Sequence, residues 1–92
     1  MVTMAGTDSE KPKRIDVARE RAEAANCVIA DLTRNGLPKE IAHDLLIGYR
    51  KSLKGHRKEE SGARKVMIAA GCLPGTLNKY RDAKMVEIRM GP

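Results

Sequence analysis

The chain has 92 residues, enough for one small domain, and it contains neither Phe nor Trp. Its apolar residues are mainly Ala, Leu, Ile, Val and Met, a composition that favours closely packed helices over strands. We therefore predict an all-α fold, a small bundle of about four helices, in which residues 14–92 form a single domain. A core of this size is marginal on its own, so a homodimer or another protein partner is a reasonable expectation.

Positive charge is concentrated in the C-terminal half of the chain. The net charge is +6, and residues 50–92 alone carry +7, from eleven basic and four acidic residues. The densest part consists of Arg50, Lys51, Lys54, Arg57, Lys58, Arg64 and Lys65. Such a patch attracts phosphate backbones through counterion release. It is equally typical of a solvated face that only keeps a protein soluble.

Several classes of function lack support in the sequence. No apolar run approaches the roughly 20 residues of a membrane span, and no apolar leader is visible, so we expect a cytoplasmic protein without a membrane partner. We find no nucleophile with a base, no phosphate loop and no metal-ligand spacing, so we predict no enzyme activity, no cofactor and no metal. Cys27 and Cys72 are expected to be buried, reduced thiols.

The first half of the chain predicts an arm and two helices. Residues 1–13 are small and polar and close with Lys11, Pro12 and Lys13, which indicates a disordered basic arm. A helix is predicted over 15–34, ending at Asn35-Gly36, and a second helix begins near Pro38. The predicted buried stripe of the first helix is Ile15, Ala18, Ala22, Ala25, Ile29 and Leu32; that of the second is Ile41, Ala42, Leu45, Leu46, Tyr49 and Leu53.

The second half predicts two more helices around a glycine turn. After a mobile, charged connection at 55–61, a third helix is expected from about Ser61, a residue suited to cap it. Gly71 is expected to form the turn, and Pro74 or Gly75 to open the fourth helix. The tail at 85–92 alternates weakly in hydropathy, so we expect it to be extended or to trail off.

The segment Ala63–Asp82 has the pattern of a helix-turn-helix. That motif needs a residue tolerant of positive φ at the turn and apolar residues at fixed positions around it. With Ala63 as the first of twenty positions, Gly71 falls on the turn. The five apolar positions are filled by Val66, Ala70, Cys72, Leu77 and Tyr80.

Residues 70–80, with the sequence AGCLPGTLNKY, resemble the AG-x-x-PGTL-x-x-Y stretch of TetR-like repressor headpieces and, more loosely, other bacterial helix-turn-helix regulators. The resemblance implies that the second helix of the motif enters the major groove of DNA. Two residues depart from the family pattern. Met67 stands where a small residue is usual, and Leu73 stands where Ser or Thr commonly caps the recognition helix.

The resemblance also implies which side chains meet DNA. On the second helix these are Thr76, Asn78, Lys79 and Arg81, since Asn pairs with adenine while Lys and Arg reach guanine or phosphate. Asp82 would repel phosphate. The basic residues upstream complete the predicted DNA-binding set: Arg50, Lys51, Lys54, Arg64 and Lys65.

A second stretch, residues 36–45, resembles the G-x-x-x-KEIA-x-x-L scaffold helix of LuxR-type and sigma-type headpieces, and a one-residue insertion would complete the pattern. Ala42 fits the small position of that pattern, whereas Leu46 occupies its glycine position. The following residues 49–58 are strongly basic, which suits a helix that contacts phosphates.

Two functions remain open at this level. The first is a small transcriptional regulator, encoded on a phage or mobile element, that binds duplex DNA as a dimer. The second is a helix-turn-helix-shaped module that binds a regulator protein, as antiactivators of mobile elements do. Convergence of the basic residues Arg50, Lys51, Arg64, Lys65 and Lys79 on one face beside the last helix favours DNA. Packing of that helix against the rest of the fold favours the protein partner.

Overall fold

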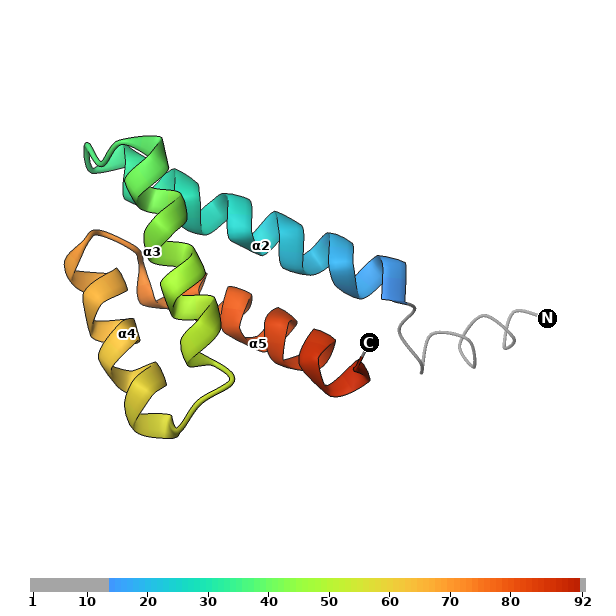
Figure 1. The fold of residues 1–92 in the computed structure, drawn as a ribbon. Helices are drawn as coiled ribbons and strands as arrows, with labels where there is room; N and C mark the ends of the chain where they lie inside the picture. The colour runs from blue at the N-terminus through green and yellow to red at the C-terminus, as the bar shows by residue number, and fades with distance from the viewer. Residues whose placement is uncertain (1–13, 92) are drawn as a thin grey trace.

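A computed structural model describes residues 14–91 of the chain, which contain four helices arranged as in Figure 1. They are α2 (Arg14–Arg34), α3 (Lys39–Ser52), α4 (Arg57–Ala69) and α5 (Pro74–Met90). The regular structure of residues 14–91 is entirely helical, so the prediction of a small all-α bundle is confirmed. The predicted arm at 1–13 lies outside the described residues. No helix within 14–91 combines the length and apolarity that crossing a membrane requires.

The four helices are arranged as two pairs. α2 and α5 lie along one another in opposite directions and form the most extensive helix contact of the fold (Figure 1). α3 and α4 form a second pair, joined by the short turn at 53–56, and α3 also packs on α2. α4 contacts α5 far less than α2 does. The last helix is therefore held mainly by the first.

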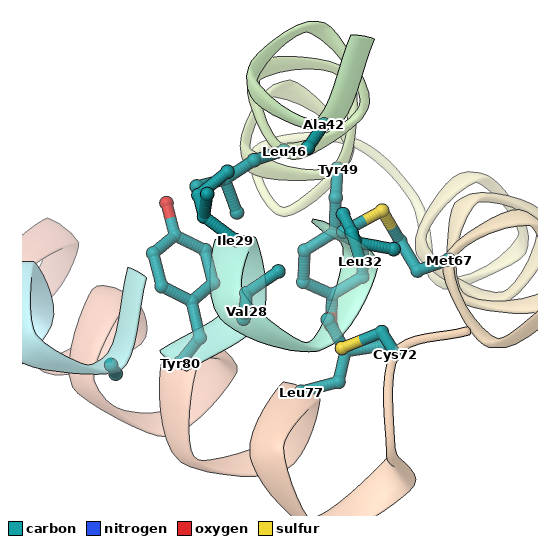
Figure 2. Packing of buried hydrophobic residues seen from close by; sticks show 11 residues of the cluster. Val28, Ile29, Leu32, Ala42, Leu46, Tyr49, Met67, Cys72, Leu77 and Tyr80 are labelled. Atoms are coloured by element: carbon teal, nitrogen blue, oxygen red, sulfur yellow. The ribbon is translucent and has the colours of Figure 1, made fainter. Parts of the chain in front are cut away.

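The core lies where α2, α3 and α5 meet, with α4 closing one side (Figure 2). Its two largest residues are Tyr49 of α3 and Tyr80 of α5, each 1 % exposed, with ring centroids 6.3 Å apart. Tilted aromatic pairs at this separation contribute about 0.5–1.5 kcal/mol beyond the burial of their surface. The residues packed around them include Val28, Leu32, Leu46, Met67, Cys72 and Leu77.

The register predicted for α2 is partly wrong. Ile29 and Leu32 are buried as expected, but Ile15 is 65 % exposed and the predicted alanines are only half-buried. Val17 and Val28 face the core in their place. Rotating the helix this way buries the larger valine side chains, and more apolar surface leaves water than alanines could provide.

Two features of α3 and α4 also differ from the prediction. Ile41 is 45 % exposed, although Ala42, Leu46 and Tyr49 of the same predicted stripe are buried. α4 begins at Arg57 instead of near Ser61, so the predicted mobile connection is only a short turn. The Glu59 carboxylate accepts a hydrogen bond from the backbone N–H of His56 at 3.4 Å, and an acidic first turn stabilises a helix N-terminus.

The motif position assigned to Val66 is wrong. Val66 is 52 % exposed, whereas its neighbour Met67, which departed from the family pattern, is 1 % exposed and packs in the core (Figure 2). The other four apolar positions fare better, because Cys72, Leu77 and Tyr80 are buried and Ala70 is half-buried. α4 is thus rotated by about one residue relative to the motif.

The glycine turn between α4 and α5 is confirmed. Gly71 has φ +116°, a conformation that L side chains rarely adopt, and the Cys72 N–H donates to the Met67 carbonyl across it at 3.0 Å. α5 then begins at Pro74, as predicted.

The prediction of an extended tail is wrong, because α5 continues to Met90. Glu87 holds these last turns in place by pairing with Lys84 at 2.7 Å and with Arg21 of α2 at 3.2 Å. The packing of α5 along α2, together with the long-range pair between Arg21 and Glu87, outweighs the weak strand-like alternation of the local sequence.

Candidate nucleic-acid interface

Exposed positive charge gathers around the turn between α3 and α4 and the C-terminal turns of α5. Six exposed cations there have no ion pair within residues 14–91, and we call them the basic end. The basic end consists of Arg50, Lys51, Lys54, Arg57, Lys58 and Arg89. Arg57 and Arg89 line one hollow, while Lys54 lines another together with the final turns of α5. Both hollows therefore join the turn to α5.

The carboxylates near the basic end all have partners. Glu60 accepts a hydrogen bond from the Tyr49 hydroxyl at 2.7 Å, and Glu59 accepts the His56 N–H. Asp82 pairs with Arg81 at 3.2 Å, and Glu87 pairs with Arg21 and Lys84. The partners of Glu59 and Glu60 are neutral groups and do not offset the carboxylate charge, whereas Asp82 and Glu87 are paired with cations. The six unpaired cations outnumber these two uncompensated carboxylates, so the positive field is reduced only in part.

The hydroxyl groups of the two core tyrosines, Tyr49 and Tyr80, both have raised pKa values. Burial, followed by the hydrogen bond to Glu60, raises the pKa of Tyr49 above its usual range. Burial also raises the pKa of Tyr80, while the charges of Arg50 and Arg21 act in the opposite direction. Both hydroxyls therefore stay protonated at neutral pH, and Tyr49 serves as a hydrogen-bond donor.

The residues predicted to read DNA from the second helix of the motif do not form one surface. Thr76 and Asn78 are half-buried, and the Oδ1 atom of Asn78 is enclosed without a hydrogen-bond partner in residues 14–91. Arg81 is half-buried and is paired with Asp82. Lys79 is exposed, but it lines a groove between α2 and α5 beside Glu20 and Glu23.

The predicted basic residues divide in the same way. Arg50, Lys51 and Lys54 belong to the basic end. Arg64 turns inward on α4: its Nη1 atom is enclosed, and its charge acts on the buried Tyr49 and Cys72. Lys65 lies on the exposed outer side of α4. The fold therefore brings together only part of the predicted set, and it adds Arg57, Lys58 and Arg89.

The start of α5 is tied to α2, although its N-cap position has no side-chain cap. Leu73, at the N-cap position, makes no side-chain cap, but its backbone N–H donates to the Oδ2 atom of Asp31 at 3.1 Å. Asp31 is 4 % exposed and also pairs with Arg34 of α2. The Asn35 side chain donates to the Gly71 carbonyl at 3.2 Å. Sequence reasoning missed both contacts because they join positions that are far apart in the chain.

The two cysteines have different environments, so the prediction that both are buried is wrong for Cys27. Cys72 is buried beneath the turn, where desolvation and then the charge of Asp31 raise its pKa to about 11. Cys27 is exposed and lines the groove between α2 and α5. Within residues 14–91 no group of three or more His, Cys, Asp or Glu side chains could hold a metal ion.

Comparison of the chain with protein-family models, with curated proteins and with solved structures found no match.

Proposed function

We propose that the protein is a small DNA-binding regulator of transcription that holds duplex DNA chiefly by its phosphates, through the basic end. The observation that carries the proposal is the grouping of six exposed, unpaired cations where every nearby carboxylate already has a partner. Ionic contacts with phosphate supply most of the affinity of non-specific DNA binding and position a protein on the duplex. The resemblance of residues 70–80 to helix-turn-helix repressors supports the same function. Arg64, Lys65 and Lys79 do not join Arg50 and Lys51 beside α5, and α5 is packed along α2; both observations favour the second candidate function described below.

The exposed surface of α5 bears on whether the protein reads the base sequence of DNA or contacts mainly its phosphates. Its exposed positions include Gly75, Lys79, Asp82, Val86 and Arg89, which carry two cations, one carboxylate and one apolar side chain. Such a face offers few groups for the donor and acceptor pattern of base pairs. We therefore propose that phosphate contacts provide most of the affinity, with only modest discrimination between sequences.

The test is the salt dependence of binding to a fluorescent duplex of about 20 base pairs. If the six cations contact phosphates, log K falls against log salt with a slope of about −5, and affinity drops about 10³-fold between 50 and 200 mM salt. The double variant Lys54→Gln, Arg57→Gln should reduce the slope by about two.

A matched double variant controls for net charge. Lys65→Gln with Lys79→Gln removes the same charge from positions outside the basic end and should leave the slope nearly unchanged. Equal losses in the two double variants would refute this location of the interface, and no binding at 50 mM salt would refute DNA binding altogether. Footprinting on the neighbouring promoter region, combined with a reporter gene, tests the regulatory role.

A second candidate function is a protein-binding module that acts on a regulator, as an antiactivator does. The observation that favours it is the groove between α2 and α5, where Glu20, Glu23 and Asp82 surround a small apolar floor at Ala24. This side of α5 repels phosphate and suits a partner that presents basic and apolar side chains. Glu20→Gln with Glu23→Gln should abolish capture of such a partner and leave DNA binding intact or strengthened. A pull-down that returns only nucleic acid would count against this function.

The predicted homodimer stays a prediction, which sedimentation at several concentrations can test.

A further inference from the structure

The larger of the two hollows beside the basic end has an unusual combination of walls. It has a volume of about 480 Å³ and lies between the turn at 53–56, the start of α4 and the C-terminal half of α5. Three arginines from two helices, Arg57, Arg81 and Arg89, line it. Leu53, Met85 and Val86 provide an apolar side. We call it the arginine hollow.

Two of the three guanidinium groups are free to bind a ligand. Arg81 is engaged by Asp82, and the other carboxylate of the hollow, Glu60, accepts the Tyr49 hydroxyl. Arg57 and Arg89 are exposed and have no ion pair within residues 14–91. A guanidinium group presents its donors in a planar fork that matches two oxygens of one phosphate.

The start of α4 lies at the rim of the hollow. The amides of Glu59 and Glu60 bond to the His56 carbonyl, whereas the amide of Arg57, which lines the hollow, has no backbone acceptor within the described residues. The carboxylates of Glu59 and Glu60 already lie in this first turn, so the helix N-terminus adds little further attraction for an anion. Three arginines against Glu60 and Asp82 leave the hollow with a net positive charge, which suits a phosphate group.

The apolar half of the hollow suggests what the anion is attached to. Leu53 and Met85 are half-buried and Val86 is 37 % exposed, so a ligand that covers them removes apolar surface from water. We propose that the arginine hollow binds a phosphate monoester attached to a partly apolar group, such as the nucleoside of a nucleoside monophosphate. Two sources share this chemistry, a free mononucleotide and the 5′-phosphate end of a nucleic-acid strand.

Calorimetric titration of the full chain at 50 mM salt tests the proposal. Adenosine 5′-monophosphate should bind at least tenfold more tightly than adenosine, since hydrogen bonds between charged groups account for that difference. It should also bind more tightly than inorganic phosphate, which cannot cover the apolar wall. Equal binding of the nucleotide and adenosine, or of the nucleotide and inorganic phosphate, would overturn the proposal.

Variants locate the site. Arg57→Gln and Arg89→Gln should each weaken nucleotide binding about tenfold. Val86→Asp should weaken it without removing a cation, because it places a carboxylate in the apolar wall. The control Lys65→Gln, outside both the hollow and the basic end, should change binding less than twofold. All four side chains are exposed, and circular dichroism checks that each variant folds. Unchanged binding in both arginine variants would refute the assignment.

The same assay separates the two sources and keeps this inference distinct from the proposed function. A hexanucleotide that binds more tightly with a 5′-phosphate than with a 5′-hydroxyl assigns the hollow to strand ends. Binding of adenosine 5′-monophosphate with no difference between the two hexanucleotides assigns it to free nucleotides. A protein that binds duplex DNA but no nucleotide refutes only this inference. Nucleotide binding without duplex binding refutes only the proposed function.

Discussion

Replacing Met67 with alanine tests the packing of α4 most directly. Met67 is the fully buried residue of α4, 1 % exposed, and it packs against the cluster that contains Tyr49 and Leu32. Truncating a buried methionine costs about 2–5 kcal/mol, from the lost burial and from the cavity left behind. α4 has few other core contacts to compensate, so we expect a loss of about 2–4 kcal/mol in the free energy of unfolding. For a domain of this size the melting temperature should fall by roughly 10–25 °C.

The neighbouring substitution Val66→Ala is the matched control. Val66 is 52 % exposed, so its truncation removes little buried surface, and alanine has the higher helix propensity. We expect a change within about 0.5 kcal/mol, in the stabilising direction or close to zero. Urea unfolding followed by circular dichroism measures both variants. A larger loss for Val66→Ala than for Met67→Ala would refute the register of α4 and restore the position that the helix-turn-helix pattern assigns.

Three further predictions concern the turn, the thiols and the ion pairs. Gly71→Ala should lower the free energy of unfolding by about 2 kcal/mol or more, because Gly71 has φ +116°. Gly62 lies inside α4 with open space around it, so Gly62→Ala should raise that free energy by about 0.5–1 kcal/mol in the same unfolding assay. Cys72 is buried and its pKa is raised to about 11, whereas Cys27 is exposed. Iodoacetamide at pH 7.5 should therefore label Cys27 in the native protein and Cys72 only after unfolding, which mass spectrometry can measure. Rapid labelling of Cys72 in the native protein would contradict its burial. The hydrogen bond from Lys84 and the pairing with Arg21 lower the pKa of Glu87 in the folded protein. The ionised Glu87 side chain therefore stabilises the fold above the ordinary glutamate pKa of 4.5, and this contribution is lost as the pH falls through the lower pKa of the folded protein. The advantage of the native protein over Glu87→Gln, below about 1 kcal/mol, should therefore disappear between about pH 5 and pH 3, and a constant difference across that range would contradict it.

Apart from the start of α4 and the C-terminal end of α5, the helix ends were predictable because their signals are local. Asn35-Gly36 ends α2, Gly71 forms the turn before α5, and Pro74 opens α5, each through backbone preferences of the residue itself. The one misplaced start, that of α4, depends on a carboxylate of Glu59 that reaches back to the preceding residue. A capping interaction of this type is visible in sequence only when the cap residue is Ser or Thr, and here it is His56.

The helix faces were harder to predict because they depend on which helix lies opposite. Alanines at regular spacing in α2 suggested a stripe, yet Val17 and Val28 are buried, since α5 packs along that side. The charge density of the sequence identified Arg50 and Lys54 at the candidate site. It could not separate Lys79 from them, because the acids beside Lys79 come from α2, more than fifty positions earlier.

The hydrogen bond from the Leu73 amide to Asp31 has a consequence for how the chain folds. It joins residues 42 positions apart in the sequence, and it fixes the start of α5 to the C-terminal part of α2. α3 and α4 can pair through a short loop, whereas α2 must wait for α5, and closing the longer loop costs more chain entropy. We expect the α3–α4 hairpin to form early and the docking of α5 to be the step that limits the rate of folding. Substitution of Asp31 should then slow folding as well as lower stability, which stopped-flow refolding of Asp31→Asn can measure.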